Sequence, residues 1–423
     1  MKDRSEAQVE RAYQDAKERY SAYGIDTDEV LSRLSGVEVS MNCWQGDDVA
    51  GFEGADSITG GGILATGNYP GRARNVAELR QDAELAFSLI PGKQRFNLHA
   101  IYLDSQKAVD RDEIAPEHFA SWIDWAKKLG IGLDFNPTFF SHDKAAEGYT
   151  LASYDGDIRR FWIEHGKRCR EIAADMGRKL GSSCVNNLWI PDGSKDDTTD
   201  RLRRRELLVE SLDEVFAAKF PAEETLDAVE SKLFGIGSES FVAGSHEFYL
   251  AYALTRKLVL TMDAGHYHPT EGIAEKLSAL LPFMDKVLLH VSRPVRWDSD
   301  HVVLFDDATR AVGREIIRAD ALDRVILAVD FFDASINRII AWVVGLRSTT
   351  KSLLAAMLEP NAMIREAEEA GRLGERLALL EDARTMPISA VWDKFCLEQG
   401  TPLGGEWLDA VRRYETEVLL KRS

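Results

Sequence analysis

Ionisable residues recur at the ends of four successive apolar runs in the second half of the chain. They are Glu230 and Lys232 after the first run, Asp263 and His266 after the second, His290, Asp298 and Asp300 in and after the third, and Asp330 after the fourth. Any one of them alone is more often a helix cap, a salt-bridge partner or a hydrogen-bonded core residue. Together they would bury several unpaired charges, which is costly unless a cation balances them.

The carboxylates and imidazoles of this set therefore indicate a two-metal site. Oxygen-rich ligation with a few imidazoles favours Mn²⁺, Mg²⁺ or Co²⁺ over a thiolate-binding metal. The residues that could converge on one metal are Glu230, Asp263, His290 and Asp330. Those that could hold a second, more exposed metal are His266, Asp298 and Asp300, with Asp263 or Glu230 as a bridge. His268 is a competing ligand, disfavoured because Pro269 fixes it in a turn.

Strand-like runs that alternate with helical segments must position these side chains. The runs cover residues 36–44, 95–102, 132–139, 184–190, 226–234, 258–265, 287–293 and 325–332. The clearest helical patterns cover residues 5–22, 117–130, 157–181 and 203–220. This alternation predicts an α/β fold, a closed (β/α)₈ TIM barrel, whose catalytic residues lie at the carboxyl ends of the strands. An open doubly wound sheet is the alternative, but no Gly-rich phosphate fingerprint follows the first run.

The barrel is predicted to form one domain over residues 1–333, including an N-terminal helix. Residues 334–423 are rich in Leu, Ala, Glu and Arg and predict a helical extension, either a small domain or a subunit-packing arm. Gly60, Gly61 and Gly62 lie in a large loop after the first run. Without a following Lys-Ser/Thr signature, they indicate an active-site loop more than a phosphate cradle.

The composition of the chain indicates which classes of binding partner and which cellular compartment to expect. The 423 residues are 45% hydrophobic and carry a formal charge of −18, which disfavours nucleic acid as a partner. No run approaches the roughly 18 apolar residues of a membrane span, and no signal-like segment opens the chain. The four cysteines show no CxxC spacing, as expected for a reducing cytoplasm and a cysteine-free metal site.

Four longer motifs carry a resemblance. They are VESKLFGIG (229–237), TMDAGHYHPTEG (261–272), HVSRPVRWDSDHV (290–302) and CWQGDDVAGFE (43–53). The chain is similar to the xylose isomerase group of two-metal sugar isomerases, in which the residues matching Asp263 and His290 are a Glu and a carboxylate. With Asp and His at these places, it closely resembles the L-rhamnose isomerase family along essentially its whole length.

The resemblance implies isomerisation of L-rhamnose, a small-molecule aldose, to L-rhamnulose. It implies Mn²⁺, with Zn²⁺, Co²⁺ or Mg²⁺ as alternatives in one site, and a cytoplasmic homotetramer. The structural metal would take the residues matching Glu230, Asp263, His290 and Asp330. The catalytic metal would take those matching His266, Asp298 and Asp300.

The expected catalytic set is Lys232, His99, Asp330 and Asp300. Lys232 would donate a hydrogen bond to sugar O1, Asp300 or Asp298 would orient a metal-bound water, and His99 would assist ring opening. A purely structural His99 is nearly as well supported. We expect a hydride shift rather than an enediol, because no carboxylate stays free of metal to act as a carbon base.

Aromatic residues at strand ends predict the pocket walls. Trp44 and Trp189 would stack on sugar C–H groups, although both could equally fill the barrel core. Ile101, Tyr102 and Phe135 are candidates for the apolar patch that a 6-deoxy sugar requires. Two rival functions remain at this point: a metal-dependent hydrolase on a TIM barrel, and a non-catalytic sugar-binding barrel.

Overall fold

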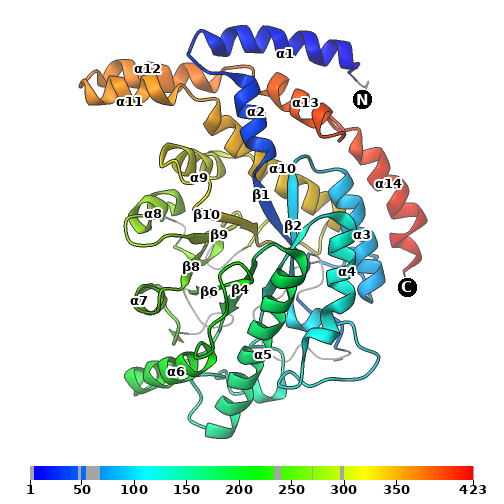
Figure 1. Cartoon of the computed structure of the whole chain (residues 1–423), viewed down its shortest axis with the longest axis vertical. Coiled ribbons are helices and arrows are strands. Elements are labelled where there is room, and N and C mark those ends of the chain that lie inside the picture. Colours follow the sequence, from blue (N-terminus) through cyan, green and yellow to red (C-terminus); the bar gives the residue numbers. More distant parts are fainter. Residues whose placement is uncertain are drawn as a thin grey trace.

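A closed barrel of parallel strands forms the centre of the molecule (Figure 1). The structure is a computed structural model that describes residues 4–45, 49–53, 67–232, 240–268, 270–295 and 300–422. The barrel strands are β1 (Glu38–Asn42), β2 (Lys93–His99), β3 (Gly132–Asn136), β4 (Cys184–Trp189), β6 (Thr225–Glu230), β8 (Val259–Asp263), β9 (Val287–Val291) and β10 (Val325–Val329). Strand β1 pairs with both β2 and β10, which closes the sheet. The predicted (β/α)₈ barrel is confirmed.

One long helix follows each barrel strand. These helices are α3 (Val76–Ser88), α4 (Ala120–Leu129), α5 (Gly156–Leu180), α6 (Arg201–Val215), α7 (His246–Arg256), α8 (Ile273–Leu280), α9 (Asp307–Arg318) and α10 (Arg338–Met357). A short antiparallel pair, β5 (Gly193–Ser194) and β7 (Phe241–Val242), joins the connections after β4 and β6.

Local sequence signals set the helix ends. The Asp155 carboxylate accepts hydrogen bonds from the first backbone amides of α5, and Gly181 ends the helix in the left-handed region with a φ of 65°. Gly177 lets α5 approach the barrel closely, since a Cβ there would lie 1.7 Å from the carbonyl oxygen of Glu224.

Strand alternation directs the ionisable residues into the barrel. An apolar layer fills part of the barrel interior and is made of Val185, Ala228, Val259, Leu288 and Ala328. Side chains two residues further on share the same face of a strand. Glu230, His290 and Asp330 follow members of this layer by that interval, so they too point inward, at the carboxyl ends.

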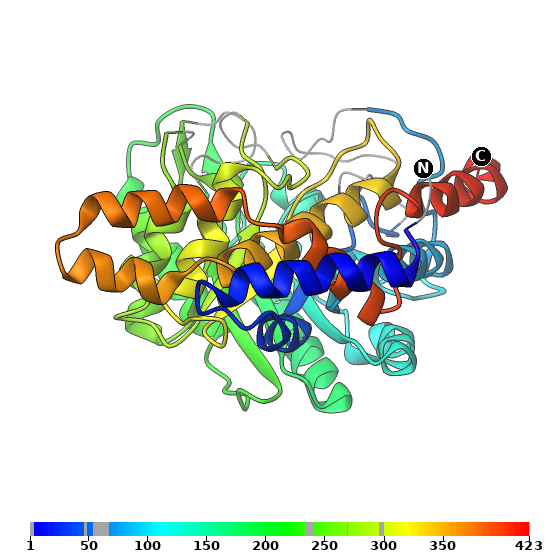
Figure 2. The same cartoon turned by 90° about the horizontal axis from the view of Figure 1, so that it is seen from above.

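Helices from both ends of the chain cover one side of the barrel (Figure 2). The N-terminal helices are α1 (Glu6–Ser21) and α2 (Thr27–Ser35), and the C-terminal ones are α11 (Asn361–Glu369), α12 (Leu373–Arg384), α13 (Ile388–Glu398) and α14 (Trp407–Glu417). Helix α1 packs along α13, and α11 pairs with α12 as a hairpin.

Helix α10 belongs to the ring around the barrel, because it packs against α9, α3 and strand β1. The proposed division between residues 333 and 334, which stays a prediction, would separate α10 from the strand that precedes it. No described helix is both long enough and apolar enough to cross a membrane.

Candidate functional site

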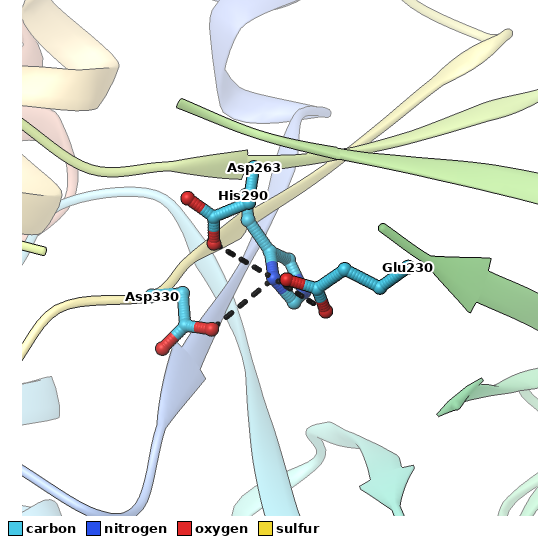
Figure 3. Close-up of side chains that lie close together, drawn as sticks. All are labelled: Glu230, Asp263, His290 and Asp330. Atoms are coloured by element: carbon cyan, nitrogen blue, oxygen red, sulfur yellow. Dashed lines mark ion pairs between the residues drawn. The ribbon is translucent and has the colours of Figure 1, made fainter. Parts of the chain in front are cut away.

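Four side chains from adjacent strands meet at the mouth of the barrel (Figure 3). Glu230, Asp263, His290 and Asp330 end or nearly end strands β6, β8, β9 and β10, and they offer ligand atoms that all lie within 4.8 Å of one another. The Nδ1 atom of His290 lies 3.2 Å from Asp330 Oδ2, 3.3 Å from Asp263 Oδ2 and 3.5 Å from Glu230 Oε2. We call these four residues the inner ligand group.

In two of these carboxylates, hydrogen bonds hold one oxygen atom, and the second oxygen faces the other ligands. Asp263 Oδ1 accepts from the Gly265 amide at 2.6 Å and from the Ser292 hydroxyl at 3.2 Å, while its Oδ2 faces His290. Asp330 Oδ1 accepts from Trp44 Nε1 at 2.9 Å. Both carboxylates are thereby oriented before any ligand binds.

Glu230 is held from the next strand. Asn187 donates to its Oε2 at 2.6 Å and in turn accepts from the Thr261 hydroxyl at 2.6 Å. Asn187 and Thr261 thus form a hydrogen-bond chain that orients the Glu230 carboxylate, as is common for carboxylates that bind metals.

A second set of residues, the outer ligand group, comprises Asp263, His266 and Asp300. His266 Nδ1 donates to the Ser231 carbonyl at 3.0 Å, which leaves its Nε2 for a metal ion, the usual arrangement of metal-binding histidines. Asp263 belongs to both groups and is the predicted bridge. Asp298, predicted as a third ligand beside His266 and Asp300, lies outside the described residues.

The electrostatics of the two groups fit a cation. Burial and the charge of Asp263 raise the pKa of the Asp300 carboxyl well above its usual range. Burial lowers the pKa of His266, but Asp263 and Glu230 outweigh it and raise that pKa to about 10. Oδ2 of Asp263, Oδ1 of Asp300 and both ring nitrogens of His290 are buried without a hydrogen-bond partner among the described residues. Divalent cations would satisfy these atoms, and the oxygen-rich donor set suits Mn²⁺, Mg²⁺ or Co²⁺.

Lys232 lies beside the outer group. Its Nζ is 4.8 Å from the centre of the Trp189 ring, and that ring stacks at 6.3 Å on the imidazole of His266. The side chain of Lys232 is buried, so its ammonium is positioned at the mouth rather than in solvent. This placement suits a donor to a sugar oxygen bound at the outer group.

His99 occupies the opposite wall, at the end of β2. Its Nδ1 lies 3.0 Å from Thr138 Oγ1 and its Nε2 lies 3.4 Å from Asn136 Nδ2. Burial, helped by the charge of Arg111, lowers the pKa of His99 to about 3, so the ring is neutral at physiological pH. The edge of Trp44 packs on it at 4.7 Å.

Comparison with known proteins identifies the family. The family model described as L-rhamnose isomerase (RhaA) matches residues 7–422. The L-rhamnose isomerase of Rhodopirellula baltica is 55% identical over 415 residues, covering 98% of this chain and 97% of that one. That of Salmonella paratyphi B is 55% identical over 416 residues, covering 98% and 99%. The chain belongs to the L-rhamnose isomerase family.

Among solved structures, the chain is similar to a D-allulose 3-epimerase from Methylomonas sp., with 12% identity and a TM-score of 0.44. The match covers 82% of this chain and 98% of that one.

Three further residues predicted to line the pocket, Ile101, Tyr102 and Phe135, are fully buried in the protein. Phe135 packs edge-to-face on Phe119 at 5.0 Å, towards the helices, because its neighbour Asn136 points into the barrel. Ile101 and Tyr102 are buried in the turn after β2, where the Ile101 carbonyl accepts from the Phe52 amide at 2.8 Å. Their contact with the sugar stays a prediction, and for Phe135 this geometry does not favour it.

Two further residues of the site gave no signal in the sequence. Phe140 lies 5.7 Å from the His99 ring and 5.4 Å from that of Trp189, and so completes an aromatic wall. His246 contacts the Ser231 hydroxyl at 2.5 Å and the His266 carbonyl at 2.9 Å. Neither is spaced regularly from the strand-end acids, so only the folded chain brings them in.

Proposed function

We propose that this protein is an aldose–ketose isomerase that converts L-rhamnose into L-rhamnulose with two divalent metal ions. The observation that carries the proposal is the pair of ligand groups at the barrel mouth, which share Asp263. Membership of the L-rhamnose isomerase family supplies the substrate. Neither comparison supports a metal-dependent hydrolase, and that alternative is not carried further.

Isomerisation moves hydrogen between C1 and C2 of the open-chain sugar and builds negative charge on O1 and O2. Bound dications would supply the Lewis-acid stabilisation of that charge. Lys232, held against Trp189, donates a further hydrogen bond to O1. Asp300, at the outer ligand group, is proposed to orient the water that relays the hydroxyl proton from O2 to O1.

Ring opening is assigned to His99. With Nδ1 hydrogen-bonded to Thr138, Nε2 is the atom that exchanges a proton with the anomeric hydroxyl or the ring oxygen. The walls formed by Trp44, Phe140 and Trp189 exclude water from the reacting carbons.

The hydrogen on C2 is proposed to move to C1 with its electron pair. O2 then loses its proton to become the ketone, and O1 gains one to become the hydroxyl. Support comes from the described acids at the mouth, since each belongs to a ligand group and none remains as a carbon base. Reaction in deuterated water is expected to leave C1 of L-rhamnulose free of deuterium. Substantial incorporation there would establish an enediol instead.

The substrate is tested by turnover on a panel of L-rhamnose, L-mannose, L-lyxose and D-allose, with metal analysis of the same sample. L-rhamnose is expected to give the highest kcat/KM, with loss of activity in EDTA and recovery in Mn²⁺. Activity on another aldose alone would refute the substrate, and unchanged activity in EDTA would refute the metal dependence.

Mn²⁺ is the proposed metal, with Zn²⁺, Co²⁺ or Mg²⁺ as alternatives in one site. The proposed assembly is a cytoplasmic homotetramer in which the C-terminal helices pack between subunits. Helix α12 supports this role, because Leu373 and Leu377 expose 57% and 59% of their surface. Sedimentation velocity measures the mass directly.

A further inference from the structure

A buried arginine holds three backbone carbonyls of the loop that follows β3. Arg111 lies in the connection between β2 and α4 and is 2% exposed. Its Nη1 donates to the carbonyls of Thr138 and Phe140, both at 2.6 Å, and its Nη2 donates to that of Ser141 at 3.0 Å.

The remaining donors of Arg111 bind Glu53. Its Nη2 lies 2.9 Å from Glu53 Oε2, and its Nε lies 3.1 Å from Oε1. Glu53 is itself placed by the turn before it, in which Gly51 has a φ of 63° and a Cβ would lie 2.5 Å from the Ile101 carbonyl oxygen. Arg111 therefore ties together the connections that follow β1, β2 and β3.

His165 of helix α5 secures the same loop from below. Its Nε2 accepts from the Thr138 amide at 3.0 Å, and its Nδ1 donates to the carbonyl of Arg111 at 3.0 Å. Ser141 at the end of the loop has a φ of 51°, a conformation that non-glycine residues rarely adopt unless their surroundings enforce it. We call Arg111, Glu53 and His165 the loop clamp.

The clamped loop carries two groups of the site. Thr138 contacts His99 Nδ1 through its hydroxyl at 3.0 Å, and Phe140 lies between His99 and Trp189. Arg111 reaches neither the ligand groups nor the mouth through any of its hydrogen bonds given above. Apart from the effect of its charge on His99, its influence on the reaction passes through Thr138 and Phe140.

We propose that Arg111 is a positioning residue that sets the aromatic wall and the orientation of His99 in the sugar pocket. Only a guanidinium offers five donors in a rigid fork, so lysine cannot hold three carbonyls and a carboxylate at once. The proposal rests on the proposed isomerase function, since it assigns Thr138, Phe140 and His99 to the pocket of that reaction.

Arg170 provides a matched control. It is also buried, at 3% exposed, and it pairs with Asp227 at 2.8 Å and with the Val215 carbonyl at 2.8 Å. Those contacts join α5 to β6 and to the end of α6, on the outside of the barrel. Replacing Arg170 with lysine removes a similar buried fork without touching the loop after β3.

The experiment compares Arg111→Lys, Glu53→Gln and Arg170→Lys with the wild-type enzyme. Each is assayed for kcat and KM on L-rhamnose, bound Mn²⁺ and Tm, at a temperature well below the lowest Tm. For Arg111→Lys we expect kcat/KM to fall about 10- to 100-fold with bound Mn²⁺ unchanged, because small misplacements of pocket groups have effects of that size. Glu53→Gln should lower kcat/KM by a smaller factor. Arg170→Lys should keep kcat/KM within about twofold of the wild-type value, although its Tm falls by a similar amount.

Equal losses of kcat/KM in Arg111→Lys and Arg170→Lys would overturn the proposal, because they would reflect stability alone. Crystal structures of the same variants give a second readout. Residues 138–141 and the Phe140 ring should shift in Arg111→Lys but not in Arg170→Lys, and an unmoved loop would also overturn it. If the wild-type enzyme fails to turn over L-rhamnose, the proposed function fails, while the crystal structures still decide whether Arg111 positions the loop.

Discussion

Asp263 links the chemistry of the two ligand groups at the scale of single residues. It ends β8, belongs to both groups, and has one oxygen tied to the Gly265 amide and the Ser292 hydroxyl. Its second oxygen is buried and turned to His290. A carboxylate restrained in this way can serve two cations with little reorganisation, which is the condition for electrostatic stabilisation of a transition state.

Lys232→Met tests the oxygen-polarising role of the ammonium group. Methionine keeps much of the stem that packs on Trp189, so folding and bound metal should be unchanged while kcat falls about 10²- to 10³-fold. Lys276→Met is the matched control, because Lys276 also lies over an aromatic ring, that of Tyr267, at 4.8 Å. Loss of bound metal in Lys232→Met, or an equal loss of kcat in the control, would contradict the assignment.

His165 predicts a pH dependence of stability. Burial, with the charge of Arg111, lowers the pKa of His165 to about 3 in the folded protein, whereas an unfolded histidine titrates near 6.5. The unfolded chain therefore binds the proton first as pH falls below 6.5. The free energy of unfolding should fall by up to about 1.4 kcal/mol per pH unit from this group, and this loss should continue until pH nears 3.

Denaturant unfolding between pH 7 and pH 5 measures this effect in the wild-type protein and in His165→Gln. The variant should be less stable at pH 7, because the hydrogen bonds to Thr138 and Arg111 are disturbed, but it should lose less stability on acidification. Parallel curves for the two proteins would show that His165 does not titrate as described.

At the scale of elements, the strands and their inward-facing acids were predictable because alternation is a local property of the sequence. The run at 287–293 contains β9 and His290, and the pattern at 157–181 matches α5 within one residue at each end. Some strands were predicted to extend too far at their carboxyl ends. After His99, for example, the apolar residues Ala100–Tyr102 form a short helical turn and do not continue the strand.

Contacts between connections could not be predicted in the same way. Phe140 reaches the pocket on a loop whose course depends on hydrogen bonds from the distant Arg111. The pocket role of Phe135 stays a prediction that rests on its residue type, and the alternation of β3 turns its ring towards Phe119. Residue type and spacing locate a metal site better than they locate an aromatic wall.

Helix α10 gives a prediction about how the barrel is stabilised. Trp342 is fully buried and donates its Nε1 to the Asn42 carbonyl at 2.9 Å, at the end of β1. Trp342→Ala should lower the free energy of unfolding by about 3–5 kcal/mol, the cost of a large cavity. Leu202→Ala on α6, where Leu202 is 69% exposed, should change it by less than about 0.5 kcal/mol. Equal, small effects in denaturant unfolding would place α10 outside the cooperative core.

For the molecule as a whole, part of the formal charge of −18 comes from acids at the barrel mouth. Five acids that contribute to it are expected ligands: Glu230, Asp263, Asp298, Asp300 and Asp330. Two dications would offset about four of those charges, so part of the acidity belongs to the interior of the barrel rather than to its surface.

The proposed packing of the C-terminal helices between subunits is tested by charge on α12. A double variant, Leu373→Glu and Leu377→Glu, should lower the sedimenting mass on dilution, because it places charge in an apolar contact. Leu202→Glu on α6 is the control, since Leu202 is 69% exposed and lies outside the C-terminal helices. If the double variant remains an unchanged tetramer, α12 does not contribute to the subunit interface.

Two divalent ions at the barrel mouth are proposed to carry out the isomerisation of L-rhamnose. The most direct measurement is a titration of the metal-free protein with Mn²⁺, followed by bound ions per chain and by L-rhamnulose formed. Activity is predicted to appear as the second ion binds, and His266→Ala, which keeps the inner ligand group, should bind about one ion and remain inactive. Full turnover by the metal-free protein, or two bound ions with normal turnover in His266→Ala, would contradict the account.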